Sequence, residues 1–253
     1  RTTIALMGVA LLVLMRQVAF ENLPNYIDFN TIILLFSMMI INANLKLAGF
    51  FNLASRWLVK GARSPRAFLA LEVLLVGVLA ALFLNDTICL MFAPFLINLM
   101  DSLKRNPIPY LIALATASNV GSTATLTGNP QNMIIGIASG ISYIDFLKAL
   151  APIAILGSLS VFLILVLLYR NEFGDGSFEI QVEKKVRIYK PLFTKSLIII
   201  LGLLIAFLLG VPVSTAAFIA AAILLLTRRL SPNKVFAEFD WGLLVFFSSL
   251  FIL

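Results

Sequence analysis

Long apolar runs separated by short basic segments constrain this chain more than any other feature. Its residues are 61% hydrophobic and 12% charged, whereas charged residues make up about a quarter of an ordinary soluble domain. Several runs approach the roughly 20 residues that an α-helix needs to cross a bilayer. The sequence therefore predicts an all-α polytopic membrane protein. The apolar runs lie near 4–20, 28–47, 67–84, 88–100, 108–118, 133–143, 149–169, 196–210, 212–227 and 241–253.

The residue types that are missing exclude most catalytic chemistry. The chain has no histidine and a single cysteine, Cys89, which lies in an apolar run. The commonest general base and the commonest transition-metal ligand are therefore absent, and no disulfide framework can form. An intramembrane enzyme would have only Asp86 and hydroxyl groups, and no nucleophile–base pair is apparent. We expect no enzyme activity, no cofactor and no metal apart from a coupling ion such as Na⁺.

The basic residues predict a topology. The net charge of +7 comes from residues between the apolar runs, as the positive-inside rule produces, so it does not indicate nucleic-acid binding. One arrangement makes 67–84 and 88–100 a re-entrant hairpin and 108–143 a single broken span. It places all 19 lysines and arginines except Arg16 and Lys148 on the cytoplasmic side. We therefore expect a multi-pass protein of the cell (plasma or inner) membrane with a cytoplasmic N-terminus.

The first polar break is "LNDT", between the two arms of the predicted hairpin. Asn85, Asp86 and Thr87 are good helix N-cap types, so a structural cap is one interpretation. An acid at the centre of a membrane helix costs about 2.5–3.5 kcal/mol on insertion scales, and a neutral Asn would cap at lower cost. We therefore favour a functional role, either holding a hard cation such as Na⁺ or taking up and releasing a proton.

The second polar break is "SNVGSTATLTGNPQN", residues 118–132. If it were an aqueous loop, the apolar runs 108–118 and 133–143 would be too short to span, so we expect it to lie within the membrane as a discontinuous helix. Gly121 is expected to let the backbone turn after Ser118 and Asn119, and 128–130 to form a second turn. The N-terminal amides of the following half-helix would attract an anion. The hydroxyl oxygens in the break come from Ser122, Thr123, Thr125 and Thr127.

Two similar segments indicate an internal repeat. "IDFNTIILLFSMMII" from Ile27 and "FDWGLLVFFSSLFIL" from Phe239 both place an Asp and an aromatic residue at the start of an apolar run. In the predicted topology the first begins outside and the second inside, which is typical of the inverted repeats of secondary transporters. Two unrelated interfacial anchors would look the same. Because the second copy reaches only Leu253, the chain is expected to be a first half plus the start of a second.

Three further features have simpler interpretations. Residues 49–63 mix aromatic and basic side chains and predict an amphipathic helix at the cytoplasmic interface. Glu72, the other acid in an apolar run, is expected to snorkel or to pair with a base near the interface. Residues 170–192 predict a solvated cytoplasmic linker.

The two breaks together resemble a known group of proteins. "SPRAFLALEVLLVGVLAALFLNDTICLMFAPFLI" and "LIALATASNVGSTATLTGNPQNMIIG" are similar to the ion transporter superfamily, which includes ArsB-type arsenite permeases, citrate transporters, plant silicon efflux transporters and divalent anion:sodium symporters. The resemblance covers about Asp28 to Leu168. It implies an inverted-repeat ion transporter fold that works as a homodimer in the lipid bilayer by an elevator motion.

The resemblance also implies site residues. A coupling cation would lie at Asn85, Asp86, Thr87, Asn119 and Gly121. The substrate would lie near Asn85 and Thr87, beside Ser122 and Thr123 and the turn formed by Thr127, Gly128, Asn129 and Pro130. The chain departs from the dicarboxylate symporters in having Asp86 where they have Asn, so a cation or proton would have to neutralise this charge beside an anion.

These inferences divide the chain and assign a function to it. Residues 1–66 would form scaffold helices and the interfacial helix, 67–148 the transport unit with its hairpin (67–101) and broken helix (108–143), 149–169 a transmembrane helix, and 193–253 the start of the second repeat. We expect a secondary active transporter of a small anion or metalloid oxyacid, of the arsenite, silicate or carboxylate class, coupled to Na⁺ or H⁺. A passive anion channel is the alternative.

Overall fold

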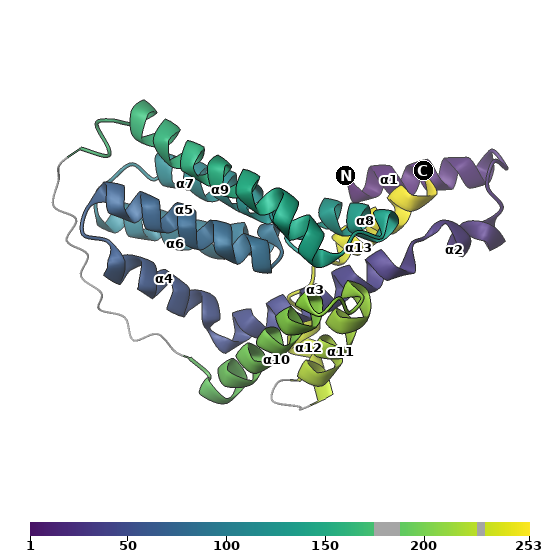
Figure 1. The fold of residues 1–253 in the computed structure, drawn as a ribbon. Coiled ribbons are helices and arrows are strands. Elements are labelled where there is room, and N and C mark those ends of the chain that lie inside the picture. Colours follow the sequence, from purple (N-terminus) through teal and green to yellow (C-terminus); the bar gives the residue numbers. More distant parts are fainter. Residues whose placement is uncertain (175–187, 227–230) are drawn as a thin grey trace.

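A computed structural model describes residues 1–174, 188–226 and 231–253. Within these residues the chain is built from helices, with no β-strand, which confirms the predicted all-α class (Figure 1). Four helices, α3, α5, α9 and α10, are long and apolar enough to cross a membrane. The elements are α1 (Thr2–Leu14), η1 (Phe20–Asn22), α2 (Leu23–Tyr26), α3 (Phe29–Ala48), α4 (Phe50–Gly61), α5 (Pro65–Leu82), α6 (Asn85–Ser102), α7 (Ile108–Ser122), α8 (Pro130–Ser139), α9 (Tyr143–Leu168), α10 (Lys190–Leu208), α11 (Val213–Leu226), α12 (Pro232–Phe236) and α13 (Trp241–Ile252).

The predicted hairpin and broken helix are both present. Helices α5 and α6 lie side by side and are joined only by Phe83 and Leu84 (Figure 1). Helix α7 ends at Ser122, and α8 begins at Pro130 after a non-helical segment, 123–129. Helix α5 packs along α7, and α9 lies against both. Helices α5, α6, α7 and α9 therefore form one packed unit, whereas α8 packs against α3.

Two details of this unit differ from the sequence prediction. Helix α9 begins at Tyr143 and not near 149, because Ser142 accepts a hydrogen bond from Asp145 N and caps the helix there. The short helix α8 ends at Ser139, where Gly140 adopts a left-handed conformation with φ 66°. Lys148 therefore lies inside a continuous helix and not in the segment that precedes it.

Gly121 has a packing role that the sequence did not reveal. It lies within the last turn of α7, so it does not provide the expected backbone turn. A Cβ atom added at Gly121 would overlap the carbonyl oxygen and Cα of Gly77 in α5. Gly121 therefore allows the backbone of α7 to touch that of α5 at Gly77.

Four of the remaining helices pack in two matching pairs. Helix α11 packs along α3, and α1 packs along α13. Both α3 and α13 begin at an aspartate N-cap: Asp28 accepts from Asn30 N, and Asp240 accepts from Leu243 N, each at 3.0 Å. In Figure 1, α3 runs from α2 toward α4, whereas α13 runs in the opposite direction, toward α1. This exchange of partners and direction is what an inverted repeat would produce.

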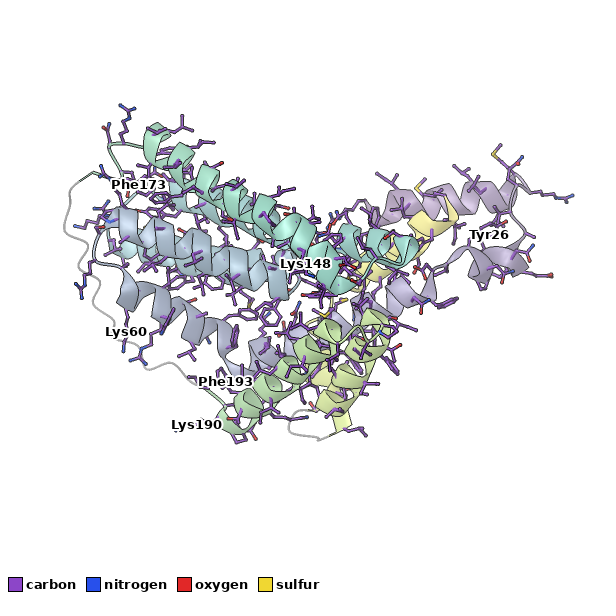
Figure 2. The ribbon with its side chains drawn as sticks, in the orientation of Figure 1. Tyr26, Lys60, Lys148, Phe173, Lys190 and Phe193 are labelled. Atoms are coloured by element: carbon purple, nitrogen blue, oxygen red, sulfur yellow. The ribbon has the colours of Figure 1, made fainter. Side chains whose placement is uncertain are left out.

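Residues predicted on opposite sides of the membrane can be located in the structure. Lys60 and Lys190, both predicted cytoplasmic, lie at the opposite end from Tyr26, which belongs to a predicted external segment (Figure 2). Residues 49–63 contain the amphipathic helix α4, with Phe51 and Leu58 buried and Trp57 exposed. The greater part of the predicted linker (175–187) and the basic residues Arg228 and Arg229 lie outside the described residues.

The glycine contact predicts an asymmetric effect of two similar substitutions. Gly121→Ala should lower the free energy of unfolding by about 1–3 kcal/mol, because the new methyl group meets the Gly77 backbone. Gly77→Ala should change it by less than about 0.5 kcal/mol, since its Cβ would lie 3.7 Å from Ser158 Oγ and 3.9 Å from Ala117 O. Thermal unfolding of the two purified variants measures the difference. Equal destabilisation would contradict this account of the α5–α7 contact.

Candidate functional site

The hairpin tip is tied directly to the broken helix. Asn85 N donates to Gly128 O at 3.1 Å, and Asn85 O accepts from Ser118 Oγ at 3.1 Å. The Asn85 side chain donates from Nδ2 to Asn119 Oδ1 at 3.3 Å. Backbone and side chain of one tip residue therefore hold the two breaks together, and Thr125 Oγ adds a hydrogen bond to Ala81 O.

The tip residues do not act as a helix cap. The turn of the hairpin is Phe83–Leu84, and Asn85, Asp86 and Thr87 form the first turn of α6. Leu84 is the N-cap residue, and no side chain caps the helix. The capping interpretation is therefore wrong, although Asp86 lies in the first turn of α6, where an acid interacts favourably with the helix dipole.

Two asparagines satisfy the backbone of the break. Asn129 caps α8 by accepting from Asn132 N at 2.8 Å, and its Nδ2 donates to Ser122 Oγ at 3.1 Å. Asn132 Nδ2 donates to Ser122 O at 3.1 Å and to Thr125 O at 2.9 Å. Carbonyl groups that leave a helix within a membrane need such partners. The amide side chains provide them inside the protein.

A polar cavity of about 400 Å³ opens where the two breaks meet. Its wall contains the first residues of α6 and of α8, the last turn of α7, and apolar side chains of α13. Seven of the predicted site residues line it. These are Asn85, Asp86, Asn119, Ser122, Thr123, Asn129 and Pro130.

Four predicted site residues lie elsewhere. Thr87 faces a different cavity, between the hairpin tip and α3. Thr127 is buried, and Gly121 packs on α5. Gly128 is enclosed, since a Cβ atom there would overlap Ser122 and lie 2.9 Å from Ala80 O. These residues shape the break, while their neighbours line the cavity.

The cavity also contains groups that sequence reasoning did not assign to the site. Arg1, which the predicted topology places on the cytoplasmic side, lines it with its guanidinium 6.0 Å from the centre of the Phe246 ring. Gln131 and Asn132 line it from α8. No local pattern marks Arg1, because its place depends on α1 packing along α13.

The electrostatics of this cavity suit a small polar solute. The N-termini of α6 and α8 both contribute to its wall, and helix N-termini carry partial positive charge. Arg1 adds a positive charge and Asp86 a negative one, while amide and hydroxyl groups supply donors and acceptors. Such a cavity can hold an anion or oxyacid, provided that the Asp86 charge is balanced.

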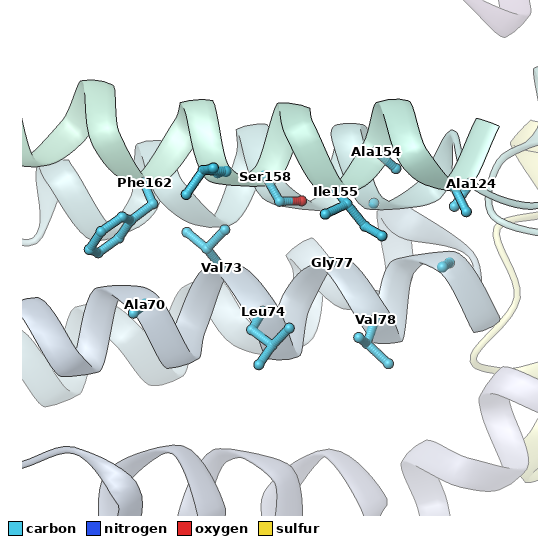
Figure 3. Close-up of a pocket in the computed structure, with 14 residues that line it drawn as sticks. Ala70, Val73, Leu74, Gly77, Val78, Ala124, Ala154, Ile155, Ser158 and Phe162 are labelled. Atoms are coloured by element: carbon cyan, nitrogen blue, oxygen red, sulfur yellow. The ribbon is translucent and has the colours of Figure 1, made fainter.

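A second cavity of about 490 Å³ lacks this chemistry. It lies between α5, α7 and α9, with Val73, Leu74 and Val78 on one side and Ile155 and Phe162 on the other (Figure 3). Its lining is apolar apart from Ser158. The polar cavity is therefore the candidate functional site.

Glu72 behaves differently from the expectation. It neither snorkels nor pairs with a base: its side chain is 0% exposed, and neither carboxyl oxygen has a hydrogen-bond partner. Arg66, the nearest base in sequence, donates instead to Phe173 O. In the described residues, no group of three His, Cys, Asp or Glu side chains could hold a metal ion.

Known proteins that are similar to this chain include membrane transporters. The family model described as "Citrate transporter" matches residues 1–253. A 46 kDa membrane protein of Mycobacterium leprae is 32% identical over 100% of this chain and 62% of its own length. The silicon efflux transporter LSI3 of Oryza sativa subsp. japonica is 33% identical over 70% of this chain and 36% of its own length. The putative transporter arsB of Dictyostelium discoideum is 33% identical over 66% of this chain and 30% of its own length. The chain thus spans less than two thirds of each of these relatives.

The role of Asn132 in the break can be tested without a substrate. Asn132→Ala leaves the carbonyls of Ser122 and Thr125 without this donor, which should cost about 1–3 kcal/mol. Amides in the segment 123–129 should then exchange with solvent roughly tenfold to a hundredfold faster. Hydrogen–deuterium exchange measures this. Gln131→Ala is the matched control, since Gln131 is exposed, and equal exchange in both variants would contradict the role of Asn132.

Proposed function

Because this chain belongs to the citrate transporter family, whose model matches its whole length, we propose that it forms part of a secondary active transporter. The transported solute is a small anion or metalloid oxyacid, and its movement is coupled to Na⁺ or H⁺. The observation that carries this proposal is the polar cavity at the junction of the hairpin tip and the broken helix. It combines two helix N-termini with a single carboxylate, that of Asp86.

The substrate binds at the break in this proposal. Ser122, Thr123 and Asn129 offer hydroxyl and amide groups to its oxygen atoms, and the N-terminus of α8 offers partial positive charge. The size of the cavity, about 400 Å³, is in the range of small-molecule sites. Leu243 and Phe246 of α13 form an apolar wall opposite these groups.

Asp86 couples the substrate to a cation. A carboxylate beside an anion disfavours binding through like-charge repulsion. A cation or a proton at Asp86 removes this repulsion, so the two solutes bind more tightly together than either does alone. Coupling then follows from charge balance at one residue.

Transport proceeds by relative movement of two units. Helices α5, α6, α7 and α9 pack as one unit, and α10, α11 and α13 pack around α3 as another, with α8 lying between them against α3. Motion of the first unit past the second, in an elevator-type cycle between two copies of the protein, would carry the cavity from one side of the membrane to the other. A passive anion channel would use the same polar groups without such movement.

The relatives narrow the choice of solutes to test. One is named a silicon efflux transporter and another an arsB transporter, while the family is described by citrate. We expect the full-length protein in proteoliposomes to move one of arsenite, silicate, citrate or phosphate, faster with an imposed Na⁺ or proton gradient. Flux that does not depend on either gradient, at a turnover rate typical of channels, would support the passive channel instead.

The role of Asp86 gives a specific prediction. Asp86→Asn should reduce gradient-driven uptake to the rate measured without a gradient, because the neutral amide no longer needs a cation or proton. Asp101→Asn is the matched control, since Asp101 lies on the same helix and is exposed, and it should keep the stimulation. Full gradient-driven uptake by Asp86→Asn would show that Asp86 does not couple.

A further inference from the structure

A second polar cavity adjoins the hairpin tip on the side of α3. Its volume is about 100 Å³, and Asp86 lines it as well as the larger cavity described above. Its other polar groups come from α3, from α6 and from the residues around the start of α13. These groups are Asn42, Lys46, Thr87, Glu238 and Asp240.

Asn42 has an oxygen atom without a partner. The residue is 3% exposed, and its Oδ1 is buried and makes no hydrogen bond. Its Nδ2 donates to Thr87 Oγ at 3.4 Å, which places the amide beside the hairpin tip. A buried acceptor without a partner costs about 1–3 kcal/mol, so this oxygen is available to a ligand in the cavity.

The charges around the cavity favour a cation. Lys46 already forms an ion pair with Glu238, and Asp240 Oδ1 accepts from Leu243 N. Asp240 keeps its negative charge while it caps α13, so Asp86 and Asp240 both leave negative charge available to a ligand here. The cavity of about 100 Å³ is a quarter of the volume of the larger cavity, about 400 Å³, so it suits a monatomic ion with a few waters better than an oxyacid.

We propose that this cavity binds Na⁺, with Asn42 Oδ1, Thr87 Oγ and the Asp86 carboxylate as protein ligands. Hard cations prefer such a set of carboxylate, amide and hydroxyl oxygens. The site differs from the cation site expected between the hairpin tip and the broken helix, because one ligand comes from α3. It also gives Thr87 a role, although Thr87 does not line the larger cavity.

The site has a consequence for the transport cycle and in this respect rests on the proposed function. Asn42 belongs to α3, whereas Asp86 and Thr87 belong to the hairpin. The full set of ligands therefore exists only while the hairpin tip lies against α3. Bound Na⁺ would stabilise this arrangement over others in proportion to its differential affinity.

Cation binding can be measured without any substrate. The thermal midpoint of the purified full-length protein is followed as NaCl replaces choline chloride at constant ionic strength. We expect Na⁺ to raise the midpoint. Asn42→Ala should increase the half-saturating Na⁺ concentration at least about tenfold. Asn44→Ala is the matched control. Asn44 is 1% exposed on the same helix, but its Nδ2 donates to Ile40 O at 2.8 Å, so this variant should keep the half-saturating Na⁺ concentration of the unmodified protein.

Two further variants distinguish a loss of Na⁺ binding from misfolding. Asn42→Asp retains an oxygen at this position and should keep the Na⁺ effect, and Thr87→Val removes one ligand at nearly constant shape and should weaken it. The proposal is overturned if Asn42→Ala and Thr87→Val respond to Na⁺ as the unmodified protein does, or if Na⁺ gives no stabilisation at all. A protein that binds Na⁺ through Asn42 yet moves none of the four test solutes would retain this site and lose the proposed function.

Discussion

The structure depends on the need to satisfy backbone groups where a helix stops within the membrane. Carbonyl and amide groups released at such a point have no water to bind and must find partners inside the protein. Here the Asn132 side chain donates hydrogen bonds to the carbonyl oxygens of Ser122 and Thr125. Asn85 N, at the hairpin tip, donates to Gly128 O in the broken helix. Each break therefore completes the other. A polar site at this junction follows, because the groups that stabilise the breaks must be polar and must lie close together.

Close packing of the helices makes that arrangement rigid. Gly121 allows the backbone of α7 to touch that of α5 at Gly77, so the hairpin and the first half of the broken helix are held together close to their polar junction. Small residues serve this purpose in membranes, where burial from water contributes little to helix association. A site built on helix ends that are fixed in this way keeps its geometry without a bound ligand.

The sequence predicted the elements of this unit well, and their detailed roles less well. Apolar length and the distribution of Lys and Arg predicted the hairpin and the broken span, since both follow from the thickness of the bilayer and the positive-inside rule. The predicted role of Gly121 was wrong, because a glycine in a polar stretch is as compatible with a turn as with a close contact between helices. The capping role considered for Asp86 failed because the turn residues are the apolar pair Phe83–Leu84. Asn42 could have been noticed as an amide inside the apolar run 28–47, but only the packing of α3 against the hairpin tip shows what lies beside it.

In the function proposed above, Asp86 would allow one junction to bind two solutes. Its carboxylate borders both the larger cavity at the break and the smaller cavity beside Asn42. A cation in the smaller cavity would therefore change the electrostatic potential in the larger cavity, because only the Asp86 side chain separates the two. No structural rearrangement would be needed. Reciprocity then requires that an anion in the larger cavity increase the affinity for the cation by the same factor. Coupling of this kind needs an acid at the tip, which a neutral Asn at the same position would not supply.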